Sequence, residues 1–318
     1  MQGYGKIILF GEHAVVYGYP ALAASIESGI ESSMQDPRNK TFTLNIPSWN
    51  LQVSVDDKTT IAKVMQVIQQ GIGKDKEYGT VLIKPNIPSR AGLGSSAAFS
   101  VSIIKTLLEH QKQIWTPEQI NELAYQSEIV FHGTPSGIDN TIANYGGLCY
   151  LCDATQHTFP EQYPHTTITL SKNTAYLLPP LQKPPKFIII NTQKERKTKA
   201  IVEHVRTLLQ KNTKEVQNIL QNIGKLALKG YEALLINDYE KLANYMNQNQ
   251  EYLQQIEVSC PEIEHVIDIA KNAGAIGAKL TGAGRGGCVI ALAPNKEEHV
   301  VQACQEKNFP AFITNIGV

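Results

Sequence analysis

The chain is 318 residues long, which is enough for about two domains and a sizeable buried core. It is 42% hydrophobic and 18% charged, a composition typical of globular proteins, and its 29 Lys and Arg balance its 29 Asp and Glu. Sequence-independent affinity for nucleic acid depends on many unpaired cations. The charge balance therefore argues against a general polyanion binder, and we expect no nucleic-acid partner.

The five cysteines, an odd number, do not form the pattern of a disulfide framework. Cys149 and Cys152 form a C-x-x-C inside an apolar run, but no second pair and no histidine at zinc-finger spacing accompany them. Buried strand thiols are therefore favoured over a zinc site. The segment 1–10 is too poor in apolar residues for a signal peptide, and no stretch approaches the ~18 apolar residues of a membrane span. These patterns predict a cytoplasmic protein with no membrane partner.

The first half of the chain is predicted to form several strands and then two helices. Alternating apolar and polar residues are typical of half-buried antiparallel strands, and apolar residues at helical spacing indicate a helix that begins near Ser96. The predicted strands cover residues 7–10, 42–46, 51–55 and 80–83, and the predicted helices begin near 96 and cover about 117–131.

A proline-rich segment, 177–185, is the candidate linker, because its four prolines can continue neither a helix nor a central strand. We therefore place two domains over 1–183 and 184–318. The second is predicted to contain strands at 187–190, 289–292 and 312–314, helices at about 197–211, 215–235, 238–255 and 261–272, and a helix between the last two strands. Strands and helices mix without a regular βαβ alternation, so the fold class is predicted to be α+β.

Three glycine-rich segments occur at 11–18, 88–98 and 279–288. Such turns, bounded by apolar runs, mark places where the backbone approaches another group closely. In the central one, Gly92 and Gly94 leave backbone amides bare, and Ser95 and Ser96 follow where the predicted helix begins. The unpaired N–H groups and positive dipole of a helix start form an anion site. The central loop is therefore predicted to bind phosphate.

Other interpretations of the central loop are weaker. It lacks the Gly-Lys-Ser/Thr of a Walker A loop. The pattern G-x-G-x-x-A is nominally met from Gly92 to Ala97, but Pro85 and Pro88 stand between the strand and the loop, where a dinucleotide turn would begin at the strand end. A glycine turn with a serine N-cap and no ligand stays open as an alternative.

Taken together, the three segments resemble the motif regions of the galactokinase, homoserine kinase, mevalonate kinase and phosphomevalonate kinase superfamily (the GHMP kinases), in the right order across residues 5–288. Lys6–Gly18 is similar to the mevalonate kinases in particular, because Ala14-Val15-Val16 stands where galactokinases have Thr or Asn, Asp and Tyr. The resemblance implies an N-terminal domain related to domain 2 of ribosomal protein S5, a ferredoxin-like C-terminal domain, and ATP as phosphoryl donor.

The resemblance also assigns roles to individual residues. Asp139, in Gly133–Asn140, matches the catalytic aspartate, Lys6 matches the catalytic-region lysine, and Ser96 and Glu128 match the Mg²⁺ ligands. The residues implied to contact ATP are Arg90, Ala91, Gly92, Leu93, Gly94, Ser95, Ser96 and Ala97, and those implied near the alcohol are Glu12, His13, Ser136 and Thr198. The sequence departs from the family at Arg90, where glycine is usual, and at Gly3-Tyr4-Gly5, which replaces Ala-Pro-Gly.

Phosphoryl transfer to an alcohol requires in-line positioning and charge neutralisation. Mg²⁺ keeps several waters, so one carboxylate, one hydroxyl and the nucleotide phosphates suffice to hold it. Asp139 would act on the attacking hydroxyl as base or orienter, and Lys6 would offset charge on the γ-phosphoryl group. The carboxylate of mevalonate needs a cation or donors, and His13, Arg196 and Lys197 are the candidates.

We therefore expect ATP-dependent phosphorylation of the 5-hydroxyl of mevalonate, with Mg²⁺, and the family resemblance also implies a homodimer. The alternatives are a GHMP kinase of another small alcohol (homoserine, a sugar or phosphomevalonate) and a catalytically silent ligand-binding homologue. Five site assignments have alternatives with no role in binding or catalysis. They are Arg196 in a solvated helix start, Asp139 as a helix N-cap, 281–287 as a plain β-turn, Glu12 in a surface turn, and Glu128 on an exposed helix face.

Overall fold

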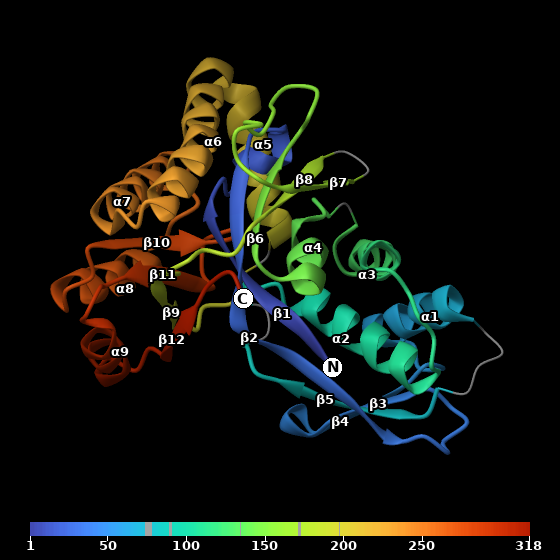
Figure 1. Cartoon of the computed structure of the whole chain (residues 1–318). Helices are drawn as coiled ribbons and strands as arrows, with labels where there is room; N and C mark the ends of the chain where they lie inside the picture. Colours follow the sequence, from blue (N-terminus) through green and yellow to red (C-terminus); the bar gives the residue numbers. More distant parts are fainter. Residues whose placement is uncertain (74–77, 89–90, 134, 171–172, 197) are drawn as a thin grey trace. The chain divides into compact units, whose positions relative to one another are not determined.

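The computed structural model describes residues 1–73, 78–88, 91–133, 135–170, 173–196 and 198–318 (Figure 1). The chain divides into two compact units. Unit 1 comprises Met1–Lys6, Ser28–Ser89 and Gly94–Gly146, and unit 2 comprises Ile7–Glu27, Arg90–Leu93 and Gly147–Val318. Each unit is described by itself below. The predicted boundary between 183 and 184 stays a prediction.

Unit 1 contains a mixed sheet in the order β4-β3-β5-β2, and β1 also pairs with β2. Its hairpin is antiparallel, with Leu44 opposite Val53, while β3 runs parallel to β5. The predicted antiparallel strands at 42–46 and 51–55 are therefore confirmed. The strands are β1 (Gln2–Phe10), β2 (Ala21–Asp36), β3 (Thr43–Ile46), β4 (Leu51–Ser54) and β5 (Thr80–Pro85), and a short helix, η2 (Pro47–Trp49), joins β3 to β4.

The helices of unit 1 are α1 (Thr60–Ile72), α2 (Ser95–His110), α3 (Pro117–His132) and α4 (Ile138–Tyr145). They gather on one side of β3, β4 and β5 (Figure 1), with α3 against α1, α2 and α4. A Cβ at Gly71 of α1 would lie 2.5 Å from a methyl carbon of Leu123, so α1 approaches α3 closely because that side chain is missing. Helix α3 begins with a capping box between Thr116 and Gln119. The predicted helices from 96 and over 117–131 are confirmed.

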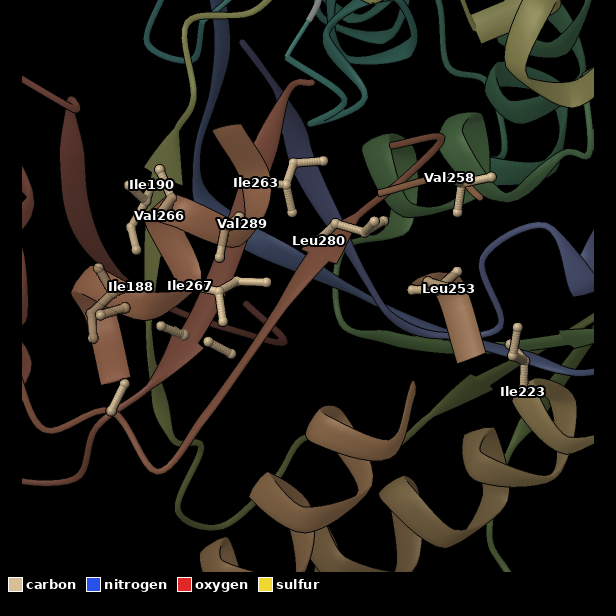
Figure 2. Close-up of a cluster of buried hydrophobic side chains, with 14 of the residues drawn as sticks. Ile188, Ile190, Ile223, Leu253, Val258, Ile263, Val266, Ile267, Leu280 and Val289 are labelled. Atoms are coloured by element: carbon tan, nitrogen blue, oxygen red, sulfur yellow. The ribbon is translucent and has the colours of Figure 1, made fainter. Parts of the chain in front are cut away.

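Unit 2 contains an antiparallel four-stranded sheet in the order β10-β11-β9-β12. Its strands are β9 (Lys186–Asn191), β10 (Gly277–Thr281), β11 (Cys288–Leu292) and β12 (Ala311–Asn315). Figure 2 shows side chains from β9, β10, β11 and the neighbouring helices in one buried cluster, with Ile188, Val289 and Ile267 among those labelled. The continuous apolar runs of these strands are thus explained by burial.

Five helices accompany this sheet in the described part of the chain: α5 (Thr198–Lys211), α6 (Thr213–Leu235), α7 (Tyr239–Gln255), α8 (Pro261–Asn272) and α9 (Glu297–Glu306). Helix α7 covers the edge strand β10. Its Asn247 donates to the Ile276 carbonyl (3.0 Å), and Gln250 accepts from the Leu280 N–H (2.9 Å). These amides satisfy backbone groups that an open edge strand would leave unpaired.

The rest of unit 2 includes η1 (Ala14–Tyr17) and the strands β6 (Leu148–Cys152), β7 (Thr166–Thr169) and β8 (Thr174–Leu178). Strand β6 pairs with the first residues of β2 and with β8. Cys149 and Cys152 are buried on β6, as predicted. The candidate linker begins too early, because Leu177 and Leu178 belong to β8. The α+β class is confirmed, and none of the helices in the described residues combines the length and apolar character of a membrane span.

Candidate active site

Asp139 and Lys6 form an ion pair within unit 1. The Lys6 Nζ lies 3.0 Å from the Asp139 Oδ1, and Lys6 is almost completely buried. Helix α4 begins after Gly137, whose left-handed backbone (φ 89°) makes it the N-cap, so Asp139 lies inside the first turn. The alternative of Asp139 as N-cap is therefore wrong. A carboxylate and an ammonium group meet at the start of a helix, where the dipole favours negative charge.

The central loop leads into α2 through Gly94, which is the N-cap with a left-handed φ of 71°. No side chain of the described residues caps this helix start, so the alternative of a serine N-cap is wrong. Ser95 and Ser96 instead occupy the first turn, whose N–H groups have no partner inside the helix. A Cβ at Gly94 would lie 2.8 Å from the Lys6 Cγ. Glycine here leaves room for Lys6, and the first-turn N–H groups of α2 are of the kind that can bind an anion.

Glu128 of α3 is buried, and within the described residues neither of its carboxylate oxygens has a hydrogen-bond partner. Burial and, to a smaller extent, the charge of Asp139 raise its pKa to about 8, and the nearby Ser96 hydroxyl and Lys6 ammonium group oppose that shift. Unsatisfied buried carboxylate oxygens beside a hydroxyl are the hard donors that Mg²⁺ prefers. The described residues contain no cluster of three His, Cys, Asp or Glu side chains at metal-binding spacing, and a cation carried by nucleotide phosphates needs none. Glu128 and Ser96 therefore fit Mg²⁺ of that kind.

A second group of candidate residues lies in unit 2, where Glu12 and Lys279 form a fully buried ion pair. Asn249 Nδ2 donates to the other carboxylate oxygen of Glu12 (2.9 Å). The Lys279 ammonium also donates to the Leu280 carbonyl (2.6 Å). With both carboxylate oxygens engaged, Glu12 is placed to fix the turn after β1 to α7 and β10.

His13 has a left-handed backbone (φ 61°), which is unusual for a residue other than glycine, and its side chain is buried. Its Nε2 lies 2.9 Å from the Ala283 carbonyl in the third glycine-rich segment. Burial lowers the pKa of His13 to about 4, an effect that the hydrogen bond to Ala283 opposes. His13 is therefore neutral near pH 7, where it offers a hydrogen bond and no positive charge.

Arg196 meets two glycine-rich segments of unit 2. A Cβ at Gly92 would lie 2.0 Å from its Nη2, and one at Gly282 would lie 2.8 Å from its Nη1. Nη1 donates to the Thr281 carbonyl at 3.4 Å. The side chain is half-buried, so a fully solvated helix start does not describe it.

The structure thus brings Lys6, Ser96, Glu128 and Asp139 together in unit 1, where Ser136 also accepts a hydrogen bond from the Ile138 N–H (3.4 Å). Unit 2 holds Glu12, His13, Ala91, Gly92, Leu93, Arg196 and an exposed Thr198. Arg90 and Lys197 lie outside the described residues. Sequence reasoning missed His132, which contacts Ser96 and Glu128, and the partners of Glu12. A lysine between the apolar residues 278 and 280 was the available signal for Lys279.

Family models match both halves of the chain. The GHMP kinases N-terminal domain model matches residues 59–147, and the GHMP kinases C-terminal model matches residues 231–310. The chain belongs to the GHMP kinases, a family of phosphotransferases for which ATP is the expected donor. The predicted family and its α+β fold are confirmed.

Within that family, the chain is similar to mevalonate kinases. It is 31% identical to the mevalonate kinase of Thermococcus sibiricus, over 98% of this chain and 94% of that protein, and 32% identical to that of Pyrococcus abyssi, over 98% and 93%. The crystal structure of L. major mevalonate kinase in complex with R-mevalonate matches with a TM-score of 0.82 and 28% identity, over 99% of this chain and 94% of that chain.

Proposed function

We propose that this kinase transfers the γ-phosphoryl group of ATP to the 5-hydroxyl of mevalonate, giving 5-phosphomevalonate and ADP. Its full-length similarity to mevalonate kinases supports the substrate. The observation that carries the chemistry is the contact between Asp139 and Lys6, in the same unit as the uncapped start of α2. A base or orienter, a cation and a phosphate site are the parts that phosphoryl transfer to an alcohol requires.

The bare amides at the start of α2 bind the phosphates of ATP in this proposal. Gly94 keeps the approach free of side chains, and the positive end of the helix dipole attracts negative charge. Ser95 and Ala97 contribute first-turn backbone, and Ala91, Gly92 and Leu93 form the preceding part of the loop.

Asp139 accepts the proton of the attacking hydroxyl or orients that hydroxyl toward the phosphorus atom. The Lys6 ammonium, 3.0 Å from the Asp139 Oδ1, fixes the carboxylate in place. The same ammonium offsets negative charge that builds on the transferred group. Both side chains belong to regular elements, α4 and β1, which favours a reproducible geometry.

Ser96 and Glu128 would hold Mg²⁺ when it arrives with the nucleotide. A cation held by these two residues would supply positive charge that neutralises the phosphates. Glu128 contributes a buried carboxylate whose oxygens have no hydrogen-bond partner among the described residues. A cation there would give these oxygens a partner.

Mevalonate carries a carboxylate, and Arg196 is the cation we assign to it, because His13 is neutral near pH 7. His13, Ser136 and Thr198 contribute hydrogen-bonding groups, and Glu12 acts by fixing the turn that carries His13. We also propose a homodimer on the family resemblance, and a cytoplasmic location with no membrane partner on the sequence patterns. The charge balance supports the absence of a nucleic-acid partner, and the proline-rich segment supports domains over 1–183 and 184–318.

The test is ADP release by the purified chain, measured with mevalonate, homoserine, galactose and phosphomevalonate in separate reactions with Mg²⁺ and ATP. We expect release that depends on mevalonate, and an NMR spectrum of the product with phosphate on the 5-oxygen. Asp139→Asn is the control for contaminating kinases. Turnover with another alcohol and none with mevalonate would remove the substrate and keep the kinase, whereas nucleotide binding without turnover on any alcohol would support a silent homologue.

A further inference from the structure

His132 is the last residue of α3 and lies one helical turn after Glu128. Residues four apart share one face of a helix, so both side chains point toward α2. The His132 Nε2 lies 3.0 Å from the Ser96 Oγ and 3.6 Å from the Glu128 Oε2. A single imidazole nitrogen therefore faces both side chains that are proposed to hold the cation.

This contact bears on the Ser96 hydroxyl more than on Glu128. A serine side chain rotates among three staggered positions, and nothing in its covalent structure selects the one that a cation needs. The hydrogen bond to His132 favours a position in which the hydroxyl shares a neighbour with the Glu128 carboxylate. Glu128 itself needs no such help, because it is buried and its helix is packed on both sides.

We propose that His132 is a positioning residue for the divalent cation: it holds the Ser96 hydroxyl beside the Glu128 carboxylate, so that both oxygens are presented together. This inference rests on the proposed function of Ser96 and Glu128. It assigns His132 no contact with the transferred group and no part in proton transfer, since His132 acts through Ser96. Removing one hydrogen bond of this kind should weaken cation binding about three- to tenfold.

The test measures Mn²⁺ binding to the full chain in the presence of ADP, by the electron paramagnetic resonance signal of free Mn²⁺. The variants are His132→Ala, His132→Gln, Ser96→Ala and the double variant Ser96→Ala/His132→Ala. Glutamine places an amide group near the position of Nε2, so it tests rescue by a side chain that keeps the hydrogen bond. Gln126→Ala, on the exposed face of α3, is the matched control.

We expect His132→Ala to weaken Mn²⁺ binding about three- to tenfold, and His132→Gln to bind almost as tightly as the unmodified chain. In the Ser96→Ala background, His132→Ala should have no further effect. Unchanged Mn²⁺ affinity in His132→Ala would overturn the proposal. So would an additional loss in the double variant, because His132 would then act on the cation without Ser96.

These readouts separate this proposal from the proposed function. If the unmodified chain releases no ADP with mevalonate but the variants change Mn²⁺ affinity as expected, the substrate is wrong and the role of His132 stands. Metal-free thermal unfolding accompanies each variant, and a purely structural role would lower the midpoint of His132→Ala and leave its Mn²⁺ affinity unchanged.

Discussion

Removing one member of the buried pair Glu12–Lys279 should strongly destabilise the fold, and Lys279→Met tests this. Both side chains are fully buried, and the Lys279 ammonium also contacts the carbonyls of Leu280 (2.6 Å) and Ile8 (3.5 Å). Burial lowers the pKa of Lys279, and the Glu12 carboxylate opposes that shift. Methionine removes the cation and leaves a buried carboxylate with Asn249 as a remaining partner.

Removing one partner of a buried ion pair costs about 3–5 kcal/mol in the free energy of unfolding. A chain of 318 residues has an unfolding entropy of about 0.7 kcal/mol per kelvin. The thermal midpoint of Lys279→Met should therefore fall by about 4–8 °C. The double variant Glu12→Leu/Lys279→Met removes both charges, so that only uncharged groups, such as the Asn249 amide, lose a partner. It should lower the free energy of unfolding by about 1–3 kcal/mol.

Differential scanning calorimetry at pH 7 of the single and double variants is the assay. The matched control is Lys194→Met, which breaks the exposed pair with Glu262 (2.8 Å, side chains 40% and 43% exposed) and should cost less than about 1 kcal/mol. The reasoning fails if Lys279→Met costs no more than the control, or if the double variant is less stable than Lys279→Met.

Three further predictions concern unit 1. Asp139→Asn should lower mevalonate-dependent ADP release by about 10²–10⁴-fold while ATP affinity, measured by calorimetry, stays near normal; retained turnover would remove Asp139 from the mechanism. Glu128→Gln should raise the Mg²⁺ concentration needed for half-maximal turnover. The folded-state pKa of Glu128 (about 8) lies above its usual 4.5, so the metal-free protein loses stability as the pH rises from 4.5 to 8. Glutamine cannot ionise and removes this loss. At pH 9, but not at pH 4, Glu128→Gln should therefore unfold at a higher temperature than the unmodified chain. Gly94→Ala should lower turnover at least about tenfold, because its Cβ would lie 2.8 Å from the Lys6 Cγ in a backbone with φ 71°; kinetics like those of the unmodified chain would show that the loop tolerates a side chain.

Elements with clear periodicity could be predicted from the sequence. The hairpin β3–β4 alternates strictly, and α2, α3 and α6–α8 show apolar stripes, so each was found to within a few residues. These patterns are local, and tertiary packing preserves them because each element buries one face.

Two of the elements that were missed, β2 and α4, lack such a pattern. Strand β2 is 16 residues long and rich in Ala and Ser, so its burial does not alternate along the chain. Helix α1 does carry an apolar stripe, formed by Ala62, Met65, Ile68 and Ile72, and the Thr59 side chain caps its start by accepting from the Ala62 N–H (3.0 Å), so the sequence could have predicted it. That cap was a usable signal. Helix α4 has only eight residues, too few for a stripe.

The motif residues of unit 1 could be predicted because family resemblance places them in one pattern, and the contact between Lys6 and Asp139 agrees with it. The partner of Glu12 could not be predicted. Glu12 and Lys279 are 267 positions apart, and a single sequence carries no information on which buried charges will pair. His132 was missed for a similar reason, since its significance depends on Ser96 in another helix.

The glycines of the central loop have a structural reason that the sequence does not show. The sequence predicts that Gly92 and Gly94 lack side chains so that phosphate can approach the backbone amides. In the structure, a Cβ at Gly92 would lie 2.0 Å from the Arg196 Nη2, and one at Gly94 would lie 2.8 Å from the Lys6 Cγ. Each glycine therefore also makes room for a cation that its own unit brings to the loop. Within each unit, a position that lacks a side chain therefore has a cationic side chain beside it, and positive charge next to a bare backbone favours an anion there.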